Sequence, residues 1–317
     1  MTELLVGTKK GLFVLEGEPG AEYEVKTRAF AGQPVEYAMR DPRSGRVLAT
    51  VTSAFYGPKV WYADDPSGEW EQADGLALPE GGDEALERIW TIVPGEDDET
   101  VYAGGDPGVL FESHDGGLSW ELNRTLWEHP TRPEWQPGGG GLCLHSIVPW
   151  PGDPDRLALG LSAVGIWLTE DGGKTWRHGN DGIRPRYLPD DAPADTIQLC
   201  IHNLHRAPKR PERLFMQFHG GVYRSDDAGE TWTDISAGLP SDFGFPLVVD
   251  PADPDSAYVI PLVADMDRVT PDGRVRVYET RDAGATSGDV FGSGDAGASW
   301  FTAAAHLPPV YSVRASG

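Results

Sequence analysis

The sequence predicts an all-β protein built from repeats of short strands, and three observations support this. Of its 317 residues, 40 are Gly and 27 are Pro, which is too many for a fold made of long helices. The apolar fraction is 39% and includes 11 Trp, which is enough to form a buried core. An eight-residue motif that ends in Trp also recurs along the chain.

The recurring motif has the order hydroxyl residue, any residue, Asp, Gly or Ala, Gly, any residue, hydroxyl residue, Trp. Its four complete copies cover residues 113–120, 169–176, 225–232 and 293–300, with a worn copy ending at Trp70 and a truncated one at 280–286. In a tight turn, Gly permits positive φ and the Asp carboxylate accepts hydrogen bonds from the turn's own amides. We therefore expect these motifs to be structural hairpin turns and not catalytic sites.

Shared strands surround each motif. One predicted strand lies directly before it, at 108–111, 165–168 and 221–224, and another lies earlier, at 100–103, 156–159 and 213–216. A third begins near Trp90, His145 or His202, and a fourth follows the motif's Trp. Four antiparallel strands in every 50 to 56 residues are typical of a β-propeller blade.

Counting the first strands of the blades predicts seven blades. Six of these strands begin near Tyr37, Trp90, His145, His202, Phe245 and Val310. Trp232 and Trp300 are 68 residues apart, whereas two repeats need about 112, so about 44 residues are expected to be absent between Thr286 and Ser287, with one further first strand among them. The sequence thus predicts a single domain over residues 1–317, a seven-bladed propeller of four-stranded antiparallel blades. Pairing of the N- and C-terminal strands is expected to close it.

On these motifs the sequence resembles the Asp-box (BNR-repeat) β-propellers of the sialidase-like and sortilin-like superfamily, which includes glycosyl hydrolases. The resemblance covers nearly the whole chain and implies the fold, but Asp-boxes occur in proteins with unrelated activities. Sialidases of this group carry Arg-Ile-Pro near the start, where this chain has Met39-Arg40-Asp41-Pro42. We therefore do not expect sialidase activity.

Charge and cysteine content restrict the partners and the compartment. The 50 acidic and 26 basic residues give a net charge of −24, which repels nucleic acids and anionic membranes. The N-terminus lacks the features of a signal peptide, and the two cysteines, Cys143 and Cys200, form no disulfide framework. We expect a cytoplasmic protein that binds a small-molecule or carbohydrate ligand, and neither nucleic acid nor a membrane.

Three histidines are predicted to meet at one end of the propeller channel. His145 and His202 match at the start of the first strand of their blades, and His219 lies in a loop that faces the same end. Because neutral imidazoles bind zinc, manganese, iron and copper, these three are the predicted ligands of a divalent transition metal of unspecified identity. His145 and His202 are also catalytic candidates, with Glu87 as a carboxylate partner. The alternative is that His145 and His202 only hydrogen-bond to water and backbone groups.

Aromatic and basic residues near the same end are candidates for binding substrate. Two of them, Trp127 and Trp135, lie in the long connection after the motif at 113–120, where the alternative is packing on neighbouring blades. The predicted substrate-binding residues are Tyr37, Arg88, Trp90, Trp127, Trp135 and Tyr311. Cys143 and Cys200 are expected to pack in the core.

These expectations lead to two hypotheses of function. The first is an enzyme, hydrolase-like or lyase-like, that acts on a small molecule or a glycoside in a polar, metal-binding pocket. The second is a non-catalytic binding or assembly propeller.

Overall fold

The computed structural model describes residues 1–185, 197–285 and 310–316. It is all-β apart from the short helix α1 (Arg124–Trp127) and two 3-10 turns, η1 (Arg132–Glu134) and η2 (Pro271–Gly273). The chain divides into two compact units, the first formed by Met1–Trp127 with the C-terminal strand and the second lying within Glu128–Trp300. In the described parts of the chain, no helix has the length and apolar character needed to cross a membrane.

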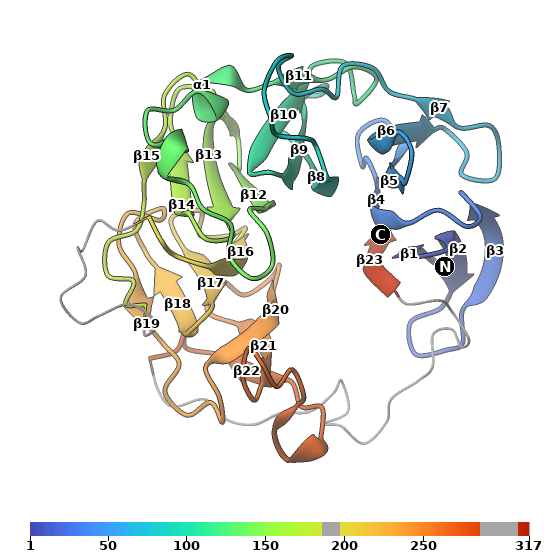
Figure 1. The fold of residues 1–317 in the computed structure, drawn as a ribbon. Helices are drawn as coiled ribbons and strands as arrows, with labels where there is room; N and C mark the ends of the chain where they lie inside the picture. Colours follow the sequence, from blue (N-terminus) through green and yellow to red (C-terminus); the bar gives the residue numbers. More distant parts are fainter. Residues whose placement is uncertain (186–196, 286–309, 317) are drawn as a thin grey trace. The chain divides into compact units, whose positions relative to one another are not determined.

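The first unit contains three antiparallel sheets of four strands each. In spatial order they are β23 (Val310–Ser316), β1 (Thr2–Thr8), β2 (Gly11–Gly17) and β3 (Glu24–Ala29); β4 (Val35–Arg40), β5 (Val47–Ser53), β6 (Gly57–Ala63) and β7 (Glu71–Gln72); and β8 (Arg88–Pro94), β9 (Val101–Asp106), β10 (Val109–Ser113) and β11 (Glu121–Leu122). Strand β23 lies beside β1, with Ser316 opposite Glu3 (Figure 1). The predicted pairing of the N- and C-terminal strands is confirmed.

The second unit contains three further antiparallel sheets. They are β12 (Leu144–Trp150), β13 (Asp153–Leu161), β14 (Gly165–Thr169) and β15 (Arg177–His178); β16 (Ile201–Arg206), β17 (Leu214–Phe218), β18 (Gly221–Ser225) and β19 (Thr233–Asp234); and β20 (Phe243–Val249), β21 (Ala257–Leu262) and β22 (Tyr278–Thr280). The described residues therefore form six sheets, one of them three-stranded, and not the seven four-stranded blades that the spacing predicted. The seventh blade and the break after Thr286 were assigned to residues that lie outside the described ranges.

Apolar side chains from neighbouring sheets form the core of each unit. In the first unit, Met39, Leu48 and Phe111 belong to one buried cluster that extends over two sheets. In the second, Val148 and Met216 belong to a cluster that likewise joins two sheets. Burial of one such side chain contributes about 1.5 to 3 kcal/mol. The predicted organisation as a single domain stays a prediction.

The aspartate of the motif organises its turn through hydrogen bonds, as the sequence predicted. Asp115 Oδ1 accepts from the backbone N–H of Leu118 at 3.0 Å and of Ser119 at 2.9 Å, and from the Ser113 hydroxyl at 2.7 Å. The Ser119 hydroxyl donates to Asp115 Oδ2 at 2.6 Å. Trp120 is buried, and its indole N–H donates to the Gly117 carbonyl at 3.2 Å. In the copies at Asp171 and Asp227, the backbone N–H and the hydroxyl of the second hydroxyl residue donate to the aspartate in the same way. The copy at 293–300 lies outside the described residues.

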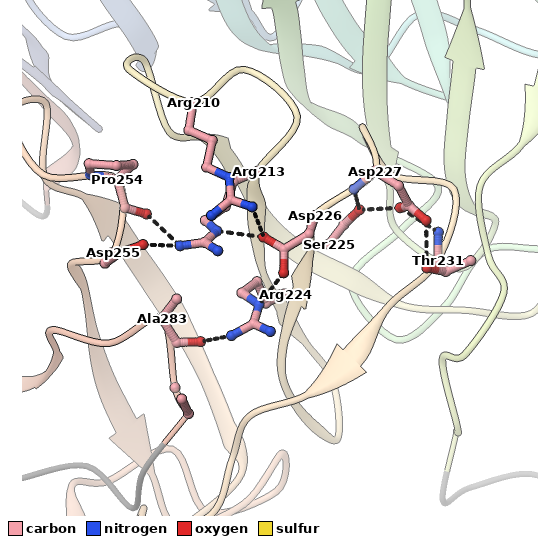
Figure 2. Close-up of polar contacts among 12 residues, drawn as sticks. Arg210, Arg213, Arg224, Ser225, Asp226, Asp227, Thr231, Pro254, Asp255 and Ala283 are labelled. Atoms are coloured by element: carbon pink, nitrogen blue, oxygen red, sulfur yellow. Dashed lines mark hydrogen bonds and ion pairs between the residues drawn. The ribbon is translucent and has the colours of Figure 1, made fainter.

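A charged network joins the last two sheets of the second unit (Figure 2). Arg213 is 5% exposed, and its Nε donates to Asp226 Oδ1 at 2.6 Å. The same guanidinium donates to Asp255, which lies just before β21. Asp226 Oδ2 also lies 2.9 Å from Arg224 Nε, and Arg224 donates to the Ala283 carbonyl. The buried Arg213 therefore has two partners of opposite sign, which offset the cost of its desolvation.

Candidate functional site

The first strand of four sheets contains a β-bulge at the same position. The pairing of each strand with its neighbour omits one residue, and these residues are Glu36, Trp90, His145 and His202. The residue before each bulge is fully buried at 0% exposure, namely Val35, Ile89, Leu144 and Ile201. A bulge leaves its extra residue outside the ladder and redirects the side chain. In β20 the register shift between Gly244 and Leu247 spans Phe245.

The bulges correct one expectation from the sequence. Tyr37 was expected to match Trp90, but Glu36 holds the equivalent place. Tyr37 is 9% exposed, belongs to the apolar core of the first unit, and donates its backbone N–H to Thr50 Oγ1 at 2.9 Å. The physical reason is that the bulge at Glu36 shifts the alternation of the strand by one residue.

His145 uses both of its ring nitrogens within the protein. Its Nε2 lies 2.7 Å from the Ile201 carbonyl, on the first strand of the next sheet, and its Nδ1 lies 3.0 Å from the Ser146 hydroxyl. A carbonyl can only accept, so Nε2 donates and the Nδ1 of the neutral ring accepts from Ser146. Burial lowers the pKa of His145 to about 4, so this ring is neutral at pH 7. These contacts match the alternative of backbone hydrogen bonding; the metal and catalytic roles of His145 stay predictions.

His202 keeps one ring nitrogen available. Its Nδ1 donates to the Gly244 carbonyl at 2.7 Å, so the neutral ring carries its lone pair on Nε2. Burial is the main cause that lowers the pKa of His202 to about 4, and the neighbouring His219, His145 and Arg268 lower it further. A neutral imidazole oriented by a backbone carbonyl is the state in which histidine binds metals.

Cys200, His202 and His219 form a cluster at this end of the second unit. Each offers one ligand atom, and the three atoms lie within 4.8 Å of one another. The His219 backbone N–H donates to the Cys200 carbonyl at 3.0 Å, which holds the loop between β17 and β18 against the start of β16. Burial raises the pKa of the Cys200 thiol. The structure therefore brings together two of the three predicted metal ligands, with Cys200 as the third group instead of His145.

Aromatic rings surround the two imidazoles of the cluster. His202 stacks on Phe245, with ring centroids 4.6 Å apart and planes inclined by 19°. His202 and His219 meet edge to face at 5.3 Å, and Phe243 lies 5.3 Å from His202 and 5.2 Å from His219. The rings displace water from the imidazoles, consistent with the low pKa of His202.

The loop between β21 and β22 adds two charged groups that sequence reasoning missed. Asp265 Oδ2 lies 3.8 Å from His219 Nε2. The Arg268 guanidinium carbon lies 5.1 Å from the centroid of the Phe245 ring, and Arg268 Nε donates to the Asp265 carbonyl at 3.1 Å. This loop contains no copy of the motif and no histidine, so nothing in the sequence indicated that it reaches the cluster.

The two predicted stacking residues of the connection that follows the motif at 113–120 are packed into the protein. Trp135 is 5% exposed, lies 5.0 Å from the Trp167 ring, and donates its indole N–H to Thr131 at 3.1 Å. Trp127 packs against the apolar core of the first unit. These contacts agree with the alternative of packing on neighbouring blades. Cys143 is 2% exposed and packs in the core as predicted.

The remaining predicted residues belong to the first unit. Arg88 lies over the Trp90 ring at 4.8 Å, and Glu87 is exposed. Glu36, at the first bulge, was not among the predicted substrate-binding residues. Its Oε2 and the Trp90 indole nitrogen are buried and have no hydrogen-bond partner among the described residues. The backbone of Tyr311 lies in β23. The predicted roles of these residues in catalysis and binding stay predictions.

No family model matches the chain, and no curated protein matches its sequence. Solved structures of similar fold include an ancestral GH74 enzyme, 18% identical over 90% of this chain and 32% of that enzyme, with a TM-score of 0.57. A GH74 enzyme of Niastella koreensis is 15% identical over 90% of this chain and 43% of its own, with a TM-score of 0.61. YCF48, solved bound to D1 peptide, is 14% identical over 90% of this chain and 76% of its own, with a TM-score of 0.54.

The chain thus spans less than half the length of these two GH74 enzymes. At such low identity, the similarity concerns the fold alone. GH74 enzymes and YCF48 are β-propeller proteins, and the four-stranded antiparallel sheets of this chain are consistent with propeller blades.

Proposed function

We propose that the chain is a metal-dependent enzyme whose Cys200, His202 and His219 hold a divalent transition metal. The observation that supports this is the distance of at most 4.8 Å between their ligand atoms. Sulfur and imidazole nitrogen together are ligands typical of zinc. Three protein ligands leave a fourth position open, which is typical of catalytic zinc sites, whereas structural sites are closed by four protein ligands. When bound, such a metal lowers the pKa of its water and supplies a hydroxide for hydrolysis.

The side chains of the cluster are prepared for this role in different ways. The Gly244 carbonyl fixes the His202 ring with its Nε2 lone pair free to bind. The Cys200 thiol, whose pKa is raised by burial, must lose its proton to become a ligand. Metal affinity is therefore expected to rise with pH. Asp265 Oδ2 lies 3.8 Å from His219 Nε2 and adds a negative charge beside that ring.

The proposed reaction is hydrolysis or elimination on a small molecule or a glycoside. The fold similarity to GH74 enzymes supports a carbohydrate substrate at a coarse level. The turn networks at Asp115, Asp171 and Asp227 support placing the chain among the Asp-box β-propellers. A cytoplasmic location belongs to the same proposal.

Metal analysis of matched variants tests the proposal. Purified protein dialysed against zinc should retain about one equivalent by mass spectrometry. C200S and H202Q should lose most of it, whereas H145Q should retain it, because His145 occupies the equivalent bulge but has both ring nitrogens engaged. Hydrolysis of aryl glycosides and esters by the wild type should stop with a chelator and return with zinc. A wild type that retains no metal, or an H145Q variant that loses as much as H202Q, would overturn the proposal.

A further inference from the structure

We propose that Arg268 forms a carboxylate-binding subsite beside the Cys200–His202–His219 cluster, so that the substrate is a small molecule with a single carboxylate group. The statement about the substrate rests on the proposed function. The subsite itself is argued from the described residues alone. The argument comes from the position of the guanidinium, its lack of an acidic partner, and the charges around it.

The guanidinium of Arg268 is held close to the cluster by an aromatic ring. Its central carbon lies 5.1 Å from the centroid of Phe245, and the same ring stacks on His202 at 4.6 Å. A cation over an aromatic face is attracted by about 0.5 to 1 kcal/mol at an exposed site. One aromatic side chain therefore links the cation to a member of the cluster.

The backbone also fixes the direction of the Arg268 side chain. Its Nε donates to the Asp265 carbonyl at 3.1 Å within the same loop. The loop is closed by bonds between the backbone N–H of Val263 and the Val269 carbonyl at 2.9 Å, and between the Ala264 N–H and the Asp267 carbonyl at 3.2 Å. Because Nε already donates to this carbonyl, the two terminal NH₂ groups of the guanidinium are the donors that a ligand would contact.

Arg268 lacks an acidic partner, although the chain is strongly acidic. Among the described residues, no carboxylate lies within ion-pair distance of its guanidinium, whereas Arg177 and Arg213 in the same unit pair with carboxylates. Arg268 is exposed, so it is accessible to a ligand from solution. A planar guanidinium binds a carboxylate with two parallel hydrogen bonds, which gives both affinity and orientation.

The surrounding charges limit which anion fits. Asp265 and Asp267 both closely precede Arg268 in sequence, and the chain carries a net charge of −24. A polyanion such as a nucleotide triphosphate or a nucleic acid would be repelled, whereas a single carboxylate is balanced by the guanidinium. Arg268 is therefore an exposed cation beside Phe245 that a single carboxylate can reach from solution.

Acetate and its neutral counterpart acetamide are suitable probes. Their binding is followed by NMR chemical shifts of the His202 and His219 rings, in the metal-free and the zinc-loaded protein. Acetate should shift these signals in a saturable way and acetamide should not. R268Q should weaken acetate binding at least about tenfold and R268K less, because lysine keeps the charge but loses the planar fork. R274Q is the matched control, since Arg274 is exposed in the same loop, and should behave as wild type.

Several results would overturn the subsite. One is that R268Q binds acetate as tightly as the wild type. Another is that R274Q loses as much acetate affinity as R268Q. A third is that the wild type binds acetamide as tightly as acetate. The measurement on metal-free protein separates the two proposals. A protein that retains no zinc but binds acetate through Arg268 would refute the metal-dependent function and support the subsite. A protein that retains zinc but does not bind acetate would refute the subsite and support the metal-dependent function.

Discussion

His145 and His202 occupy equivalent bulges on adjacent sheets, yet they donate to the next sheet through different ring nitrogens. His145 uses Nε2 toward the Ile201 carbonyl, and His202 uses Nδ1 toward the Gly244 carbonyl, each at 2.7 Å. The residue after each bulge differs as well. Ser146 donates its hydroxyl to His145 Nδ1 at 3.0 Å, whereas the Asn203 amide turns away and donates to the Phe245 carbonyl at 3.2 Å.

This difference decides which histidine can bind a ligand. The Ser146 hydroxyl occupies the second nitrogen of His145, while His202 retains a lone pair that is directed away from its backbone contact. Two histidines that match in sequence therefore have different chemical capacities.

Acid should destabilise the protein through these two rings. Unfolded histidine has a pKa near 6.5, and burial lowers the pKa of both folded rings to about 4, so the unfolded chain binds more protons between these values. The free energy of unfolding should fall as pH drops below about 6.5, by roughly 2 kcal/mol for each ring between pH 7 and pH 5. Urea denaturation at the two pH values measures this, and H145Q and H202Q should each show a smaller pH dependence. If both variants keep the pH dependence of the wild type, its assignment to His145 and His202 is wrong.

Glu36→Gln should stabilise the first unit at neutral pH. Burial raises the pKa of Glu36 above its usual value, although the Arg88 charge and the nearby Thr52 hydroxyl favour the ionised form. The Thr52 oxygen itself makes no hydrogen bond of standard geometry. A raised acid pKa means that stability is greatest below the unfolded pKa and is lost as pH rises through the folded pKa. Removing the charge should raise the free energy of unfolding at pH 7 by roughly 1 kcal/mol, as for a typical single substitution.

Glu87→Gln is the control for that experiment. Glu87 is the exposed carboxylate at the start of the next sheet. Its substitution should leave the denaturation midpoint unchanged. Equal effects of the two substitutions would show that net charge, and not burial of Glu36, sets the stability.

Asp115→Ala should destabilise the first unit. The substitution removes the acceptor of two backbone N–H bonds and two hydroxyl bonds in the turn that precedes the buried Trp120. Leaving such donors without a partner costs about 1 to 3 kcal/mol. Thermal denaturation should show a lower Tm, and the exposed Asp98→Ala should leave it unchanged. A Tm equal to that of the wild type would mean that the turn does not depend on its aspartate.

Asp226→Asn should destabilise the second unit more than a surface pair would. Asp226 bridges the buried Arg213 and the half-buried Arg224, so the substitution leaves two arginines with weakened partners (Figure 2). Breaking a buried pair costs about 3 to 5 kcal/mol. Solvent screening at the exposed Asp226, together with the remaining contact of Arg213 with Asp255, should reduce this to about 2 kcal/mol. Asp272→Asn, which removes an exposed partner of Arg276, should cost less than about 1 kcal/mol. Chemical denaturation of both variants measures the difference, and equal costs would contradict the role of burial.

The sequence by itself determined the local features of the fold. The turn chemistry of the motif lies within eight residues, as at 113–120, so its role followed from residue types alone. The period between motifs, together with the strands shared around each copy, predicted four-stranded antiparallel sheets and the pairing of β23 with β1. The spacing also placed His202 and His219 at one end of their blade, where the structure finds them together.

Only the tertiary structure decided which of these residues act together. The bulge that redirects Glu36, and not Tyr37, is a property of the pairing between β4 and β5. The nitrogen that His145 uses depends on a carbonyl 56 residues away, and the approach of Arg268 to Phe245 depends on a loop without a recognisable motif. The physical reason is that register, ring orientation and loop position are set by contacts between segments far apart in the chain, which a local residue pattern does not encode.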